Sequence, residues 1–101
     1  MARVLVTGIG VVSSIGLNRA VFWEHCLQGR SGAVRLESPW VTETGLSTQI
    51  AAPVRGFDPI QAGIPAKNVS LLDRVVWFAL GASAEALADA GLEVAAREDR
   101  A

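Results

Sequence analysis

The hydrophobic pattern at the start of the chain predicts a strand, a turn and a helix. Residues 3–7 are mostly apolar and β-branched and are followed by glycine, which predicts a short buried strand. Residues 8–16 are rich in glycine and serine, which indicates a turn region. Residues 19–28 predict a helix, with Asn18 as its N-cap and Gly29 at the position where a left-handed C-terminal residue is favoured.

The middle of the chain is less regular. Residues 31–46 hold small polar residues and a proline, so we expect irregular structure there, apart from a short strand over 33–36. Residues 48–54 predict a second strand, which Pro53 would confine to a sheet edge or a strand end. Residues 56–65 contain two prolines and two glycines, which favour a loop.

The strongest predicted element is a helix over residues 71–90. Ser70 followed by Asp73 is similar to a capping box at its start, and Gly91 supplies the stop. Apolar side chains cover nearly its whole circumference, which is typical of a helix buried within a larger body. Its repeated alanines would let neighbouring elements approach closely, and its acidic residues make a place in a bilayer unfavourable.

Composition narrows the class of protein. The 101 residues are half apolar, and the mean hydropathy of +0.35 is high for a small free-standing domain. We therefore expect some faces of the chain to be covered by polypeptide outside these 101 residues.

Charge and cysteine content exclude several classes of site. The net charge is −1 and no basic patch is visible, so the sequence does not favour nucleic-acid binding. The single cysteine excludes an internal disulfide and a cysteine-based zinc site, and a cytoplasmic location is expected. No apolar run reaches membrane-spanning length, and glycines interrupt a signal-peptide core.

One motif is similar to the dinucleotide-binding fingerprint, in which three glycines are spaced as G-x-G-x-x-G. Gly8 and Gly10 have the right spacing, but Ser13 stands where the third glycine belongs. The predicted helix begins well after this turn, whereas the fingerprint needs a helix N-terminus directly beside the pyrophosphate. Glu37 could play the part of the ribose-binding acid, so a small nucleotide-binding α/β domain stays open as an alternative.

His25 and Cys26 are the only histidine and cysteine, and they are neighbours on the predicted first helix. Adjacent helical side chains point about 100° apart, so they cannot form a nucleophile–base pair. We expect Cys26 to be a small core residue and His25 to lie at the margin of the helix. The residues by themselves therefore indicate no catalytic site.

Four blocks occur in an order that resembles the N-terminal segment of a β-ketoacyl-[acyl-carrier-protein] synthase, an elongating condensing enzyme of the thiolase-like superfamily. The blocks are residues 3–16, residues 22–32, residues 54–59 and residues 72–92. The resemblance implies an α/β fold class, namely the N-terminal part of a thiolase-like layered α/β/α/β/α fold that is incomplete in this chain. Residues 1–101 would form the N-terminal segment of the first half of a ketoacyl synthase domain.

The resemblance also implies an acyltransferase activity without a cofactor or a metal. The family performs a decarboxylative Claisen condensation of malonyl carrier protein with an acyl thioester in fatty acid or polyketide biosynthesis. Its nucleophilic cysteine and its two histidines lie beyond residue 101, so this chain is expected to hold no catalytic residue and to be inactive alone. A non-catalytic partner subunit that determines chain length remains an alternative.

The implied partners are an acyl carrier protein and the rest of the synthase or a homodimer mate. Related enzymes often carry several basic residues just before the last helix, where they engage the acidic carrier. Here only Lys67 is basic at that place, so Lys67 is the one partner-binding candidate, and docking would be weaker or use different contacts. With a lone strand and uncovered apolar faces, the chain by itself is expected to be marginally stable.

Overall fold

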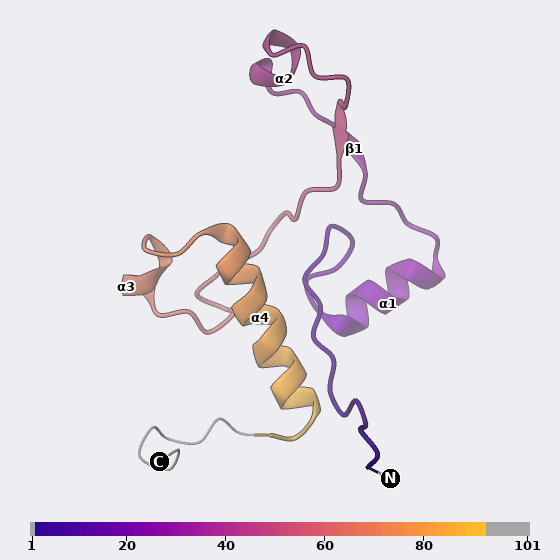
Figure 1. The fold of residues 1–101 in the computed structure, drawn as a ribbon, viewed down its shortest axis with the longest axis vertical. Helices are drawn as coiled ribbons and strands as arrows, with labels where there is room; N and C mark the ends of the chain where they lie inside the picture. The colour runs from indigo at the N-terminus through magenta and orange to yellow at the C-terminus, as the bar shows by residue number, and fades with distance from the viewer. Residues whose placement is uncertain (1, 93–101) are drawn as a thin grey trace.

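The computed structural model describes residues 2–92 as an open arrangement of helices around an extended N-terminal segment, residues 2–12. The elements follow in the order α1 (Arg19–Leu27), β1 (Val34–Arg35), α2 (Pro39–Glu43), β2 (Ile50–Ala51), α3 (Ala66–Val69) and α4 (Arg74–Asp89). The N-terminal segment runs between α4 and α1, and the strands carry α2 away from the rest as a projecting arm (Figure 1). The two strands pair antiparallel, with Val34 opposite Ala51.

The two longer helices confirm the predictions from local sequence. The side chain of Asn18 accepts a hydrogen bond from the Val21 amide at 2.9 Å, which satisfies one of the free N–H groups of α1. Gly29 follows the last turn of α1 with φ of +69°, and Gly91 follows α4 with φ of +74°. Both glycines adopt the left-handed conformation that ends a helix at low cost.

The predicted capping box at the start of α4 is wrong. Asp73 is the N-cap, its side chain makes no capping hydrogen bond, and Ser70 instead closes α3. The Leu71 amide donates to the Asn68 carbonyl at 3.1 Å, so residues 68–71 belong to the last turn of α3. The long helix therefore begins three residues later than the pattern suggested. The short helices α2 and α3 were not predicted.

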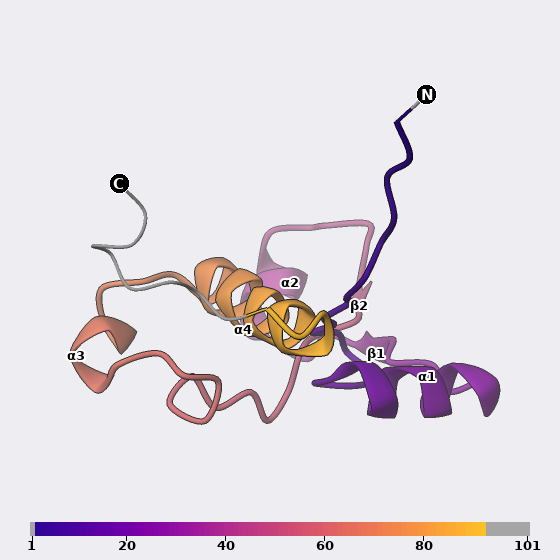
Figure 2. The same cartoon turned by 90° about the horizontal axis from the view of Figure 1, so that it is seen from below.

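The predicted buried strand over residues 3–7 does not form among the described residues. Val4, Leu5 and Val6 are 94%, 69% and 82% exposed, and they leave the body without a strand beside them (Figure 2). A strand requires the N–H and C=O groups of a neighbour, and β1 and β2 pair only with each other. The prediction of a strand over 33–36 is confirmed by β1, and the one over 48–54 is confirmed only at Ile50–Ala51.

The buried apolar core of the described residues is small. Val41 and Ile64 are the only buried hydrophobic residues in the described part of the chain, and α4 contains no buried residue although it is apolar nearly all round. The Cα radius of gyration is 17.5 Å, whereas a compact domain of about 100 residues has roughly 13 Å. The fold is thus incomplete within this chain, as expected from its high hydropathy. Within residues 2–92, no helix is long and apolar enough to cross a membrane.

Candidate functional site

The densest set of polar contacts joins the N-terminal segment, α1 and α4 through two acidic side chains of α4. Glu85 accepts hydrogen bonds from the Val11 amide at 2.9 Å and from the Arg19 amide at 2.9 and 3.1 Å. Asp89 accepts one from the Ile9 amide at 3.0 Å. Residues four apart share one face of a helix, so both carboxylates reach the same segment. We call this set of contacts the Glu85–Asp89 junction.

The junction also fixes the beginning of α1. The Glu85 carboxylate accepts a hydrogen bond from the amide of Arg19, the first residue of α1, where the helix dipole stabilises a negative charge. The guanidinium of Arg19 forms an ion pair with Asp89 and donates to the Ile9 carbonyl at 3.4 Å. The two side chains of this ion pair are 44% and 30% exposed, so the pair itself adds little stability. The backbone hydrogen bonds to Glu85 carry most of the connection.

Two glycines allow the N-terminal segment to lie directly on α4. A Cβ atom added to Gly8 would lie 2.8 Å from the Ala90 nitrogen, and one added to Gly10 would lie 2.7 Å from the Ala82 carbonyl carbon. Distances this short do not occur between non-bonded atoms, and a helix backbone cannot yield. The expected close approach at the alanines of this helix is thus confirmed. These glycines serve packing, since neither has a positive φ.

His25 holds the turn that follows the N-terminal segment. Its Nδ1 atom forms a hydrogen bond with the Ile15 carbonyl, and the Ser13 amide donates to the Gly16 carbonyl at 2.8 Å. The half-buried position of His25 fits the predicted margin of the helix. Its role within the described residues is therefore to support the turn over residues 13–16.

Cys26 is exposed, so the prediction of a small core residue is wrong. Val21, Phe22 and His25, which are expected on the same apolar side, are half-buried, whereas no described element covers the side chain of Cys26. Throughout residues 2–92, no group of three or more His, Cys, Asp or Glu side chains is placed to hold a metal ion. Neither His25 nor Cys26 takes part in a nucleophile–base arrangement there.

The geometry around Gly8 and Gly10 does not fit a phosphate cradle. Both glycines face α4, where the helix backbone fills the space that a pyrophosphate would need. The N-terminus of α1 already receives a carboxylate, that of Glu85, in the place where a phosphate would bind. Glu37, the candidate ribose-binding acid, lines a separate pocket on the arm.

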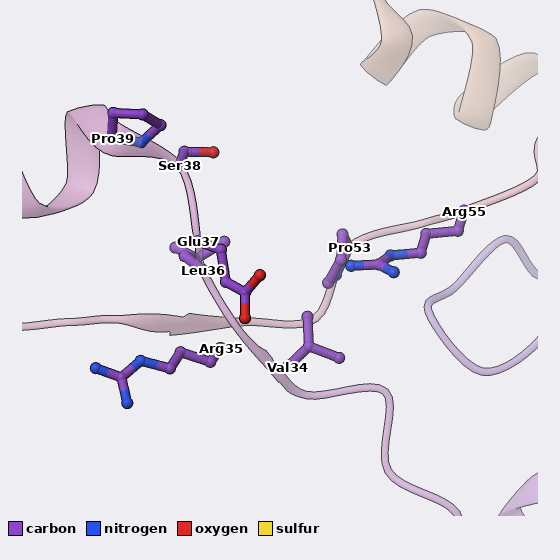
Figure 3. Close-up of a pocket in the computed structure, with 8 residues that line it drawn as sticks. All are labelled: Val34, Arg35, Leu36, Glu37, Ser38, Pro39, Pro53 and Arg55. Carbon is purple, nitrogen blue, oxygen red and sulfur yellow. The ribbon is translucent and has the colours of Figure 1, made fainter.

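That pocket is an open hollow of about 770 Å³ at the base of the arm (Figure 3). Its lining includes the charged side chains of Arg35, Glu37 and Arg55, all of them exposed. Arg35 extends away from Arg55 and donates to the Gln49 side chain at 3.4 Å. The charged groups do not converge on one point, so the hollow has no catalytic geometry.

The corner formed by α3 and the start of α4 contains the predicted partner-binding residue. Lys67 is exposed on α3. Arg74, the next basic residue along the chain, is occupied: it donates to the Val54 carbonyl at 3.0 Å, and its guanidinium carbon lies 5.1 Å from the Phe78 ring centroid. Arg74 is exposed as well, but its guanidinium is held by these contacts, whereas the side chain of Lys67 makes no hydrogen bond or ion pair within the described residues.

Known proteins match this chain along nearly its whole length. A family model described as the N-terminal domain of beta-ketoacyl synthase matches residues 1–101. A Streptomyces halstedii protein named as a polyketide beta-ketoacyl synthase 1 is 44% identical over 97 residues, covering 96% of this chain and 22% of that protein. The 3-oxoacyl-[acyl-carrier-protein] synthase 2 of Coxiella burnetii is 37% identical over 92 residues, covering 91% of this chain and 22% of that protein.

A third relative is the ketoacyl synthase alpha subunit of the tetracenomycin polyketide synthase from Streptomyces glaucescens. It is 37% identical over 101 aligned residues, which cover 93% of this chain and 21% of the relative. The chain thus spans about a fifth of the length of the relatives that it matches.

The pattern of residue types did not predict the Glu85–Asp89 junction. The available signal was a pair of acids spaced by four on a helix that is otherwise almost entirely apolar. Such a pair needs a partner when the helix is covered. The partners are backbone amides, which no residue-type pattern can reveal.

Proposed function

The chain belongs to the β-ketoacyl synthase family, and we propose that it is the N-terminal segment of a condensing enzyme that joins malonyl carrier protein to an acyl thioester with loss of carbon dioxide. The observation that carries this proposal is the family match over all 101 residues. The relatives include both 3-oxoacyl-[acyl-carrier-protein] synthases and polyketide synthases, so the proposed pathway is fatty acid or polyketide assembly.

In this proposal the chain supplies structure to the enzyme and the reacting groups come from the remainder of the synthase. The packing of Gly8 and Gly10 on α4 and the Glu85–Asp89 junction support such a role, because they fix a strand-forming segment between two helices. Neither His25, which supports a turn, nor the exposed Cys26 is assigned a step in the condensation.

We further propose that Lys67 contributes to docking of the acyl carrier protein. Its exposure on α3 and the engagement of Arg74 within its own corner support this assignment. A single exposed charge adds up to about 1 kcal/mol, or about fivefold in affinity. We therefore expect carrier docking through this corner to depend weakly on charge and weakly on salt.

The test is a chimera in which residues 1–101 replace the matching segment of the Coxiella burnetii relative. Release of carbon dioxide from labelled malonyl carrier protein in the presence of an acyl acceptor measures condensation. We expect the chimera to be active. Changing Cys26→Ser in the chimera should leave the rate unchanged, because the thiol has no role in the reaction.

The docking proposal has its own variant and matched control. Lys67→Glu should raise the KM for the carrier by about fivefold and leave kcat unchanged. Arg30→Glu reverses an exposed charge just beyond α1 and should leave both constants unchanged. A folded chimera without condensation would contradict the proposed function, and equal effects of the two charge reversals would contradict docking at Lys67.

A further inference from the structure

Helix α3 carries Lys67 but is too short to keep its own shape. It has four residues, which is about one turn, and isolated helices of this length do not persist in water. Its N-cap is Pro65, which makes no side-chain capping hydrogen bond. The position of Lys67 therefore depends on contacts between α3 and the rest of the chain.

Contacts on both sides of Lys67 hold this short helix. On the N-terminal side, Ile64 is 4% exposed and its amide donates to the Pro59 carbonyl at 3.0 Å. On the C-terminal side, the indole Nε1 of Trp77 donates to the Val69 carbonyl at 3.2 Å. Val69 is the last residue of α3, so Trp77 satisfies a carbonyl that the end of a helix leaves without an intrahelical partner.

The indole of Trp77 is itself held in place by Arg74. The two residues are three positions apart on α4, so their side chains share one face of that helix. The guanidinium carbon of Arg74 lies 6.0 Å from the centroid of the Trp77 ring, and the guanidinium also donates to the Val54 carbonyl at 3.0 Å. Trp77 thus connects the first turn of α4 to the end of α3, in the corner where α3 leads into α4 (Figure 1).

We propose that Trp77 is a positioning residue for docking of the acyl carrier protein and that it acts through Lys67. This inference rests on the proposed function. By fixing the carbonyl end of α3, the indole N–H holds Lys67 in one place, so less conformational freedom is lost when the carrier binds. Within the described part of this corner, Lys67 is the one basic side chain without an internal partner, so no neighbouring charge compensates for its misplacement.

Two substitutions at Trp77 in the chimera separate the hydrogen bond from the bulk of the ring. Trp77→Phe keeps an aromatic ring and loses the N–H, whereas Trp77→His loses bulk and keeps a ring N–H. Trp77→Phe should raise the KM for the carrier by about threefold and leave kcat unchanged, while Trp77→His should stay within about 1.5-fold of the unsubstituted chimera. A loss of packing alone predicts the opposite order, because the histidine ring fills less space.

The dissociation constant of the chimera for a fluorescently labelled acyl carrier protein, measured by anisotropy, should change by the same factors as KM. In a Lys67→Ala background, Trp77→Phe should have no further effect on it, because the charge that Trp77 positions is gone. The matched control Trp40→Phe makes the same change on α2, where Trp40 is 55% exposed, and should alter neither constant.

Each outcome decides between positioning and packing. An effect of Trp77→Phe that persists in the Lys67→Ala background, or a larger effect for Trp77→His than for Trp77→Phe, would overturn the proposal. Carrier binding that is insensitive to Lys67→Ala would overturn it too, as would a Trp77→Phe chimera whose circular dichroism shows that it does not fold. The expected order in carrier binding, by a chimera without condensation, would uphold the positioning role and contradict the proposed function.

Discussion

The close contact between Gly10 and α4 leads to a sharp prediction about two glycine substitutions. A Cβ atom on Gly10 would lie 2.7 Å from the Ala82 carbonyl carbon and 2.9 Å from the Ala86 nitrogen. Both are backbone atoms within α4, so the N-terminal segment would have to retreat by roughly 1 Å to reach van der Waals distance. Such a retreat would break the 2.9 Å hydrogen bond from the Val11 amide to Glu85.

The expected cost of Gly10→Ala follows from these two effects. Forcing extra volume into a tight contact costs about 1–3 kcal/mol. Losing a hydrogen bond to a partly buried carboxylate costs about 1–2 kcal/mol after allowing for solvent. We therefore expect Gly10→Ala to lower the free energy of unfolding by about 3 kcal/mol.

Gly45→Ala is the matched control because Gly45 has a positive φ and free space around it, whereas Gly10 has neither. Gly45 has φ of +66° and nothing within 4 Å of an added Cβ atom, whereas Gly10 has no positive φ. Backbone conformation alone would make Gly45→Ala the more costly change, at about 1 kcal/mol. The close contact between Gly10 and α4 predicts instead that Gly10→Ala lowers the free energy of unfolding more than Gly45→Ala does.

Urea unfolding of the chimera, followed by tryptophan fluorescence, measures this order. With a slope of about 2–3 kcal/mol per molar, the two midpoints should differ by roughly 0.7–1 M, with Gly10→Ala the lower. Amide exchange at Val11 should accelerate in Gly10→Ala and stay unchanged in Gly45→Ala. Equal midpoints, or a lower midpoint for Gly45→Ala, would refute the close approach as the reason for this glycine.

Three further predictions concern the two helices, and each is checked by the same unfolding measurement. Glu85→Gln removes the charge of the carboxylate that accepts hydrogen bonds from the Val11 and Arg19 amides, and it should lower the free energy of unfolding by about 1–2 kcal/mol. An unchanged free energy of unfolding would mean that the charge of Glu85 does not stabilise the junction. Asn18→Ala removes the side-chain cap of α1 and should cost about 1 kcal/mol, with a matching loss of helical circular dichroism. Ala86→Glu places a charge against Gly8 and should cost several kcal/mol in the complete chimera, so unchanged melting would contradict the packing of this face.

The sequence by itself determined the features that depend on neighbours in the chain. The bounds of α1, its Asn18 cap and the two terminal glycines follow from hydrogen bonds that span at most four residues. The pattern of alanines on the last helix also indicated a close approach, since small side chains leave space on whichever face is contacted. The order of the motifs was specific enough to indicate the family, and the family match confirmed it.

Only the tertiary structure decided which groups meet across the fold. Glu85 and Asp89 bind backbone amides that lie more than sixty positions away in the sequence, and residue types do not encode such partners. Cys26 is exposed because no described element covers its side of α1. The apolar run over residues 3–7 predicted a strand that does not form among the described residues, because a strand requires a neighbour: an extended backbone satisfies none of its own hydrogen bonds.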